Sequence, residues 1–292
     1  MKLSNSHPLR DVILFGASGQ LGSALFSVLK RHVQVRSFAW RDLKSWMPDL
    51  SLLKSEIFSD RPCDVLFASG LTDPAAGAAL LRQSNVEFVQ KIVDASQGAD
   101  ARFLTFGTIQ EHFPELCATN PYLESKLELG RWMVLQSKAS KLRGRFLHLR
   151  LHTVYGGEPK PHMFIGQIVR SLQDQTVFRM SAGDQLREYH HADDVALGVW
   201  NLLQRDWREL ADPVLDMNSG QPLRLADLAR TIYREFEASD LLDVGALARP
   251  PQENTQKVFP RSPGWLLPAS RDPLLGVVEQ LLLRDKARRD PH

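Results

Sequence analysis

The first half of the chain alternates short apolar runs with longer helical patterns. The apolar runs, which have the length of strands buried on both faces, lie at residues 11–15, 33–38, 64–68, 102–106 and 146–151. Between them, apolar residues recur at helical spacing over 21–29, 80–93 and 122–138. Regular alternation of strands and helices predicts an α/β fold in which helices cover both faces of a doubly wound parallel sheet.

The pattern changes after Gly157. The spacing predicts one helical stretch within 158–192, helices over 193–203 and 226–236, and a strand over 214–217. Residues 238–275 are rich in proline and lack a clear period, so we expect the loops of a smaller lobe. The basic, polar stretch from 284 to 292 predicts a solvated, frayed tail.

Composition excludes several classes of protein. The 292 residues include 36 Lys and Arg against 34 Asp and Glu, whereas a nucleic-acid binder needs a clustered surplus of basic residues. Cys63 and Cys117 lack short-spaced Cys or His neighbours, so we expect reduced thiols, no disulfide scaffold and no metal site. Without a secretory signal or a stretch of about 20 apolar residues, the chain is expected to be cytoplasmic and independent of membranes.

A glycine-rich turn directly follows the first predicted strand. The run Gly16-Ala-Ser-Gly19-Gln20-Leu21-Gly22 opens the first predicted helix. Glycines at this spacing allow a tight turn and a close approach of the backbone to a pyrophosphate, whose charge is met by amide groups at the helix N-terminus. These residues, and Ser69 after the strand at 64–68, are therefore candidate cofactor contacts; a glycine-rich turn without a ligand is the alternative.

A tyrosine and a lysine four residues apart provide candidate acid–base chemistry. Tyr122 and Lys126 project from one face of a predicted helix, so the ammonium group can lie beside the phenol. A neighbouring cation favours phenolate and lowers the pKa of a tyrosine from its usual value of about 10. The pair also occurs by chance in helices, so it needs support from other motifs.

Together these residues resemble the extended short-chain dehydrogenases/reductases, the NAD-dependent epimerase/dehydratase family of sugar-nucleotide epimerases, dehydratases and ketoreductases. The resemblance covers about residues 11–236. It is carried by the glycine-rich turn and by five further segments: Phe103-Leu-Thr-Phe-Gly-Thr108-Ile-Gln-Glu-His112, Asn120-Pro-Tyr122-Leu-Glu-Ser-Lys126, Leu149-Arg-Leu-His-Thr153-Val-Tyr-Gly156, Gly183-Asp-Gln-Leu-Arg187-Glu-Tyr-His-His191-Ala-Asp193-Asp194-Val-Ala and Asn218-Ser-Gly220.

The resemblance implies a role for each matching residue. Tyr122 is expected to be the general acid or base, and Lys126 to hold the nicotinamide ribose and lower the tyrosine's pKa. Thr108 matches the hydroxyl residue that bonds the reacting oxygen, with Thr105 as a weaker candidate. Arg187 matches the arginine that binds the substrate's diphosphate, a task that suits a forked guanidinium; a surface arginine paired with Glu188 is the alternative. Homodimerisation through the helix of Tyr122 is also expected.

The departures from the family pattern restrict the reaction. Thr153 stands where the family usually has asparagine, which puts the usual contact near the nicotinamide in doubt. The segment from His112 to Tyr122 is shorter than usual, so the mouth of the site is expected to differ. Dehydratases carry Asp-Glu after the catalytic threonine, whereas this chain has Ile109 and Gln110, which disfavours dehydration.

Cofactor choice depends on the end of the second strand. An acidic residue there binds the ribose 2′-OH of NAD, whereas arginine accommodates the 2′-phosphate of NADP. Arg41 favours NADP(H) over NAD(H), although Asp42 lies beside it. Asp49 is a candidate adenine contact or a helix cap. His162 corresponds to an acid of the related GDP-fucose synthases, with a solvated loop histidine as the alternative.

We therefore expect residues 1–157 to form a Rossmann-type dinucleotide-binding domain to which 188–218 return, and 158–187 with 219–292 to form a substrate-binding lobe. The leading hypothesis is an NAD(P)-dependent reductase of a 4-keto nucleotide-linked sugar. A 4-epimerase with bound NAD is the alternative. A non-catalytic NAD(P)-sensing regulator of the same fold is more remote, because such proteins usually lose the Tyr–Lys pair.

Overall fold

A computed structural model describes residues 10–38, 43, 47–139, 144–248, 262–266 and 269–289. The chain forms two compact units. One contains Met1–Leu151, Ala196–Met217 and Pro263–Leu266, and the other contains His152–Val195, Asn218–Ser262 and Leu267–His292. The chain thus changes unit at 151/152, 195/196, 217/218, 262/263 and 266/267. The sequence pattern predicted changes after residues 157, 187 and 218 only.

A six-stranded parallel sheet forms the centre of the first unit. Its order is β2 (Val35–Phe38), β1 (Asp11–Phe15), β3 (Cys63–Phe67), β4 (Ala101–Thr108), β5 (Phe146–Leu151) and β9 (Val214–Met217). All five residues of β3 are buried, as expected for an apolar strand covered on both faces. The predicted doubly wound parallel sheet is confirmed.

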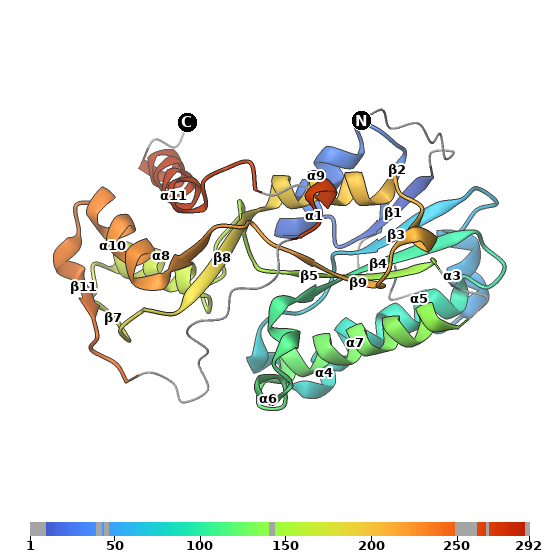
Figure 1. The fold of residues 1–292 in the computed structure, drawn as a ribbon, viewed down its shortest axis with the longest axis horizontal. Coiled ribbons are helices and arrows are strands. Elements are labelled where there is room, and N and C mark those ends of the chain that lie inside the picture. Colours follow the sequence, from blue (N-terminus) through green and yellow to red (C-terminus); the bar gives the residue numbers. More distant parts are fainter. Residues whose placement is uncertain are drawn as a thin grey trace. The chain divides into compact units, whose positions relative to one another are not determined.

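Helices flank this sheet on both sides (Figure 1). On one side lie α1 (Gln20–Leu29) and α9 (Ala192–Leu203); on the other lie α3 (Leu50–Ile57), α5 (Phe88–Ala95) and α7 (Pro121–Lys138). Shorter segments complete the unit: α4 (Ala78–Arg82), the single π turn η2 (Gln83–Glu87), α6 (Pro114–Cys117), and the 3₁₀ helices η1 (Pro74–Ala76), η3 (Ile109–His112), η5 (Trp207–Glu209) and η7 (Gly264–Leu266).

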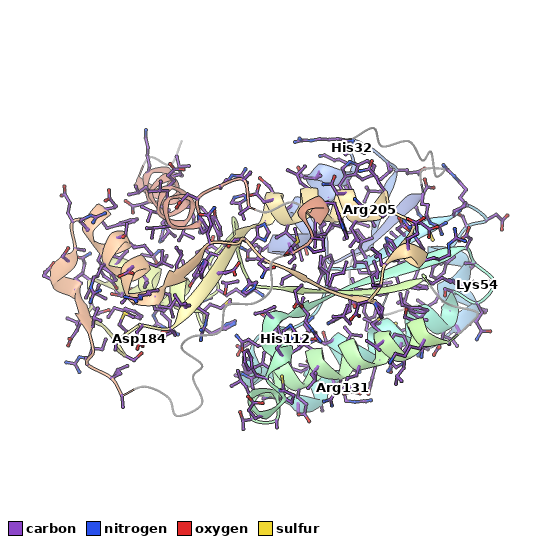
Figure 2. All side chains as sticks on the ribbon, viewed as in Figure 1. His32, Lys54, His112, Arg131, Asp184 and Arg205 are labelled. Atoms are coloured by element: carbon purple, nitrogen blue, oxygen red, sulfur yellow. The ribbon has the colours of Figure 1, made fainter. Side chains whose placement is uncertain are left out.

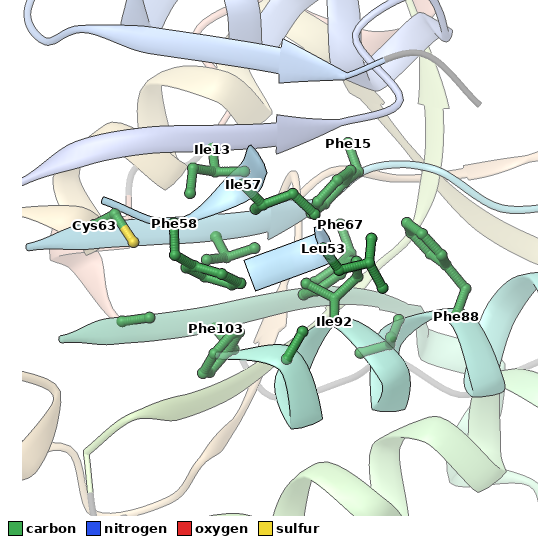
Figure 3. Packing of buried hydrophobic residues seen from close by; sticks show 14 of the residues in the cluster. Ile13, Phe15, Leu53, Ile57, Phe58, Cys63, Phe67, Phe88, Ile92 and Phe103 are labelled. Carbon is green, nitrogen blue, oxygen red and sulfur yellow. The ribbon is translucent and has the colours of Figure 1, made fainter. Parts of the chain in front are cut away.

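An aromatic cluster fixes α5 against the sheet (Figure 3). The ring of Phe15 stacks on Phe67 with centroids 5.3 Å apart and meets the edge of Phe88, also at 5.3 Å. Such aromatic pairs contribute roughly 0.5–1.5 kcal/mol each beyond their buried area. Because Phe15 and Phe67 are the last residues of β1 and β3, the cluster also holds the ends of these two strands in place.

The carboxyl ends of β1 and β3 form the topological switch point of the sheet. From β1 the chain continues through α1 to β2 on one side, and β3 begins the series of strands on the other side. Loops at such a point diverge and leave a crevice, which is where open α/β sheets bind their ligands. The glycine-rich turn follows β1, and Ser69 follows β3.

In its described residues, the second unit contains two small sheets and three α-helices. One sheet has the order β10 (Pro222–Arg224), β8 (Leu186–His191), β6 (Thr153–Tyr155), and the other pairs β11 (Leu242–Val244) with β7 (Phe178–Met180). The helices are α8 (Phe164–Asp174), α10 (Leu225–Glu235) and α11 (Pro273–Arg289), with the short 3₁₀ turn η6 (Ser239–Leu241). Tyr189 and Tyr233 are fully buried in its core.

Two features of the second unit correct the sequence analysis. The prediction of a frayed tail from 284 is wrong, because α11 continues to Arg289. Val277, Val278 and Leu281 bury one face of this helix, and Arg284 donates to the carbonyl of Gly157 and pairs with Glu158. Within 238–275, predicted as loops, β11 pairs with β7 in parallel. In the described part of the chain, no helix is long and apolar enough to cross a membrane.

Candidate active site

The glycine-rich turn between β1 and α1 has no room for side chains at two positions. A Cβ atom on Gly22 would lie 1.9 Å from the carbonyl oxygen of Gly16, and one on Gly16 would lie 2.5 Å from the backbone nitrogen of Ser69. Gly16 also has φ +88°, a conformation that favours glycine. The turn is therefore packed between the start of α1 and the loop after β3.

The N-terminus of α1 fits an anionic group. Its N-cap is Gly19 and no side chain caps the helix, so the backbone of the first turn, with the positive end of the helix dipole, is what an anionic group would meet there. The Oγ atom of Ser69 is buried and lacks a hydrogen-bond partner among the described residues. Gln20 and Leu21 occupy the first turn of α1. The cradle without side chains and this hydroxyl fit the pyrophosphate of a dinucleotide.

The loop after β3 is tied to the helix that carries the Tyr–Lys pair. The side chain of Asn85, 2 % exposed, forms two hydrogen bonds of 3.0 Å with the backbone of Leu71. It also donates to the Oγ of Ser125 at 2.9 Å, and Ser125 donates to the carbonyl of Tyr122 at 2.7 Å. Sequence analysis missed Asn85; its place four residues after Leu81 and four before Val89, on the apolar face of the helical pattern, was the available signal.

Helix α7 begins at the residues that the sequence analysis singled out. The side chain of Asn120 accepts hydrogen bonds from the amides of Tyr122 and Leu123, at 3.0 and 3.2 Å. Pro121 occupies the first helical position, where its missing N–H costs nothing. Tyr122 therefore lies in the first turn of α7, partly exposed, on the helix face that it shares with Lys126.

Lys126 is buried, with 8 % of its surface exposed, and its Nζ donates to the carbonyl of Phe106 in β4 at 3.0 Å. The same Nζ is 3.8 Å from the place that a Cβ on Gly70 would occupy. The lysine therefore joins three segments: α7, the end of β4 and the loop after β3. Its neighbourhood is the switch-point end of the sheet, where the glycine-rich turn also lies.

The two candidate threonines of β4 have different surroundings. Thr108 is the last residue of the strand and the N-cap of η3; it is partly exposed, and its Oγ1 accepts from the amide of Gln110 at 3.3 Å. Thr105 is fully buried, and its Oγ1 is 2.7 Å from the Nδ1 of His148. A reacting oxygen can therefore approach Thr108, whereas Thr105 is engaged inside the unit.

Although part of the residue is exposed, burial of the phenol and, to a smaller extent, the negative charge of Glu111 raise the pKa of Tyr122 to about 12. This is the reverse of the lowering that the Tyr–Lys pairing predicted. The phenol is therefore protonated at neutral pH, as an unperturbed tyrosine also is.

The remaining predicted cofactor residues have simpler surroundings. Asp49 caps α3 by accepting from the amides of Ser51 and Leu52, at 2.8 and 3.3 Å. The hydroxyl of Ser51, which donates to the same carboxylate at 2.7 Å, and these two amides lower the pKa of Asp49. The helix-cap interpretation thus describes Asp49 in this structure. Arg41 and Asp42 lie outside the described residues.

The predicted substrate residues lie in the second unit. Arg187 lies in the middle of its sheet, in β8, rather than in a loop, with Leu223 of β10 opposite it. Glu188, buried at 4 % exposure, accepts from the hydroxyl of Ser219 and the amide of Gly220, each at 3.0 Å. Thr153 opens β6 and is partly exposed. His162 is exposed in the turn before α8.

A doubly wound sheet with a glycine cradle at its switch point and a Tyr–Lys pair beside it defines a dinucleotide-dependent enzyme of the short-chain dehydrogenase type. The sequence matches the model of the NAD dependent epimerase/dehydratase family over residues 12–212. The chain belongs to this family, and it is an enzyme of the NAD-dependent epimerase or oxidoreductase type. No curated protein matches the sequence.

Solved structures with the same fold are distant in sequence. DesIV, a dTDP-glucose 4,6-dehydratase from Streptomyces venezuelae, is 16% identical with a TM-score of 0.75, covering 96% of this chain and 98% of its own. UDP-N-acetylglucosamine 4-epimerase from Methanobrevibacter ruminantium is 15% identical (TM-score 0.72; 95% and 98% covered). RMD from Pseudomonas aeruginosa, solved with NADPH, is 18% identical (TM-score 0.70; 94% and 100% covered). At these identities the similarity shows the fold alone.

Proposed function

We propose that this chain reduces the 4-keto group of a nucleotide-linked sugar, with Tyr122 as the general acid. The observation that carries the proposal is the place of Tyr122 in the first turn of α7, on the same helix face as Lys126, whose Nζ is bonded to the carbonyl of Phe106 in β4. Burial and the charge of Glu111 hold its pKa near 12, so the phenol has a proton to give.

The roles of the residues follow from their surroundings. When bound, a reduced nicotinamide supplies the hydride to the keto carbon. Tyr122 donates its proton to the keto oxygen, and the hydroxyl of Thr108 holds that oxygen in place. Lys126 binds the cofactor's ribose, and its positive charge stabilises the phenolate that Tyr122 becomes after it has donated its proton. Gly16, Gly19 and Gly22, with the first amides of α1 and the hydroxyl of Ser69, hold the pyrophosphate.

Epimerisation is the alternative, and several solved structures of this fold are named as 4-epimerases. An epimerase begins by removing a proton from the 4-hydroxyl, so its tyrosine must start as a base. A tyrosine with a raised pKa is protonated at neutral pH, as an unperturbed tyrosine also is, so the protonation of Tyr122 does not separate the two reactions. Reduction is preferred because Arg41 favours NADP(H), and a reductase consumes free NADPH.

Dehydration lacks its acid–base pair. Ile109 and Gln110 directly follow Thr108, and neither can exchange a proton. The nearest carboxylate in that turn, Glu111, is 3 % exposed and hydrogen-bonded to the amide of Thr108, to His148 and to Arg150. A carboxylate engaged in this way is not free to act on a substrate.

The cofactor we propose is NADP(H), on the evidence of Arg41 in the sequence, and RMD of the same fold was solved with NADPH. The substrate class rests on Arg187, whose guanidinium is suited to a diphosphate. Mass spectrometry of products from a panel of 4-keto nucleotide sugars with NADPH tests the reaction. A purified protein that carries tightly bound NAD and converts 4-hydroxyl epimers without added cofactor would establish the epimerase instead.

A further inference from the structure

A buried polar network lies at the carboxyl ends of β4 and β5. The Oγ1 of Thr105 is 2.7 Å from Nδ1 of His148, whose Nε2 is 3.1 Å from Oε2 of Glu111. Arg150 donates from Nε to the same Oε2 at 3.2 Å, and its NH1 is 3.6 Å from Oδ1 of Asp216. Histidine and glutamate thus share a buried site inside the first unit.

Two glycines make room for this pair. A Cβ on Gly107 of β4 would lie 2.1 Å from Nε2 of His148 and 2.2 Å from Oε1 of Glu111. A Cβ on Gly130 of α7 would lie 2.9 Å from Oε2 of Glu111 and 3.0 Å from Nε2 of His148. Both sites exclude a side chain, so the carboxylate and the imidazole fill the space between strand and helix.

Gly130 connects the network to the proposed active site. It follows Lys126 by four residues and Tyr122 by eight, so all three lie on one face of α7. Glu111 therefore packs against the helix face that carries the Tyr–Lys pair. On its other side, Oε1 of Glu111 accepts a hydrogen bond from the amide of Thr108 at 2.7 Å, which completes a capping box at the start of η3.

The connectivity of hydroxyl, imidazole and carboxylate resembles that of a nucleophilic triad, but its burial excludes that role. Thr105 and His148 are each 0 % exposed, and Glu111 is 3 % exposed. A nucleophile has to reach its substrate, and none of these atoms can. The network must act on the residues around it.

We propose that Glu111 is a positioning residue for the two hydroxyl groups of the proposed active site, acting through the backbone of Thr108 and through the helix face that carries Tyr122. His148 and Arg150 hold the carboxylate in place. The inference rests on the proposed function in taking the hydroxyl groups of Tyr122 and Thr108 as catalytic. The contacts of Glu111 with the amide of Thr108 and with α7 rest on the geometry alone.

The charges of the site agree with this role. Burial opposes ionisation of Glu111, but His148, the amide of Thr108 and Arg150 outweigh it, so the pKa of Glu111 lies below its usual value. The carboxylate is therefore charged at neutral pH, and that charge contributes to the raised pKa of Tyr122. The other titratable groups that surround the network are His112 in η3, Asp216 in β9 and Cys117 in α6.

The effect on Tyr122 can be measured without any substrate. The four tyrosines are replaced by a tyrosine analogue fluorinated beside the hydroxyl, and the ¹⁹F resonance of Tyr122 is assigned by its loss in Tyr122→Phe. Glu111→Gln is expected to lower the titration midpoint of Tyr122 by roughly one pH unit, because a buried negative charge has been removed. Glu115→Gln, which removes an exposed carboxylate four residues away, is the matched control and should leave the midpoint unchanged.

The effect on Thr108 is measured by amide hydrogen exchange. Glu111→Ala is expected to speed exchange at the Thr108 amide by roughly tenfold or more, because its acceptor is lost, while the amide of Leu104 in the strand interior stays protected. Should Glu111→Gln fail to fold, Glu111→Gln combined with His148→Leu removes both members of the buried pair, and the midpoint of Tyr122 should still shift in the same direction.

An unchanged midpoint of Tyr122 in a folded Glu111 variant, or an unchanged exchange rate at Thr108, overturns the proposal. Neither measurement uses a nucleotide sugar. Failure of the reductase assignment would appear instead as absence of turnover, so the two outcomes are distinguishable.

Discussion

The Nζ of Lys126 in α7 and the carbonyl oxygen of Phe106 in β4 form a 3.0 Å hydrogen bond between two buried residues. The bond fixes the helix that carries Tyr122 to the strand that ends in Thr108. Because Asn120, Pro121 and Asn85 also anchor the start of α7, the position of Tyr122 does not depend on its own hydroxyl.

Removal of that hydroxyl should therefore affect chemistry and little else. Tyr122→Phe is expected to lower turnover by roughly the 10²–10⁴ that a general acid contributes, with NADPH affinity nearly intact. Steady-state rates on the best 4-keto nucleotide sugar, together with cofactor titration, check this. Retention of more than half of wild-type turnover would remove Tyr122 from the mechanism.

The glycine cradle makes a second prediction. Gly22→Ala places a methyl group 1.9 Å from the carbonyl of Gly16, so the turn must move and NADPH affinity should fall by roughly tenfold or more. Gly264→Ala is the matched control, since a Cβ there meets nothing within 4 Å. Calorimetric titration of Gly22→Ala and Gly264→Ala with NADPH measures the difference. Equal affinities of the two variants would show that the close approach of Gly22 to the carbonyl of Gly16 is not needed for cofactor binding.

Arg41 is predicted to read the 2′-phosphate of the cofactor. Arg41→Ala should weaken NADPH binding by more than about tenfold and barely change NADH binding, because one charge-assisted partner is lost. Fluorescence titration with the two cofactors measures the difference. Equal losses for NADPH and NADH would assign Arg41 another role.

Arg187 is predicted to bind the substrate's diphosphate. Arg187→Ala should cost roughly 1.5–3 kcal/mol, or about ten- to a hundredfold in affinity for nucleoside diphosphates. Arg187→Lys should lose part of this, because a point charge lacks the fork of the guanidinium. Calorimetry compares diphosphates with the matching monophosphates, and NADPH affinity serves as the control. The sugar-nucleotide assignment fails if no diphosphate binds to the wild-type protein.

His190 makes the stability of the protein sensitive to mild acid. The side chain is 1 % exposed and neither ring nitrogen has a hydrogen-bond partner among the described residues; burial lowers its pKa from 6.5 to about 4. Above pH 6.5 the histidine is neutral in both the folded and the unfolded chain. Between pH 6.5 and 4 the imidazole of His190 is protonated only in the unfolded chain. The free energy of unfolding therefore decreases as the pH is lowered through this range, by at most about 3 kcal/mol.

Replacement of His190 should therefore flatten this part of the stability profile. We expect His190→Val to lose less free energy of unfolding than wild type between pH 6.5 and 4, measured by urea denaturation across that range. His162→Asn changes an exposed histidine and should keep the wild-type slope. If the free energy of unfolding of wild type and of His190→Val decreases equally between pH 6.5 and 4, another group causes the loss of stability in acid.

Much of the first unit could be predicted from sequence, because its strands and helices are specified by local patterns. Short apolar runs such as 12–15 and 64–67 are buried, as expected for strands covered on both faces, and glycines at 16, 19 and 22 mark the turn that follows β1. The start of α7 could also be predicted, since Asn120 and Pro121 are local signals for a helix N-terminus. Helical geometry then places Tyr122 and Lys126 on one face of that helix.

Contacts between distant segments were decided only by the tertiary structure. His148 is an isolated polar residue in a strand pattern and Glu111 lies in a short turn; nothing local shows that they meet across Gly107 and Gly130. The same holds for Asn85 beside Leu71, and for Arg284, which turns a predicted tail into a helix by bonding Gly157. The sequence determined which groups are available for chemistry. Packing decided their electrostatic surroundings, because burial and the carboxylate of Glu111, eleven residues away in the sequence, both raise the pKa of Tyr122.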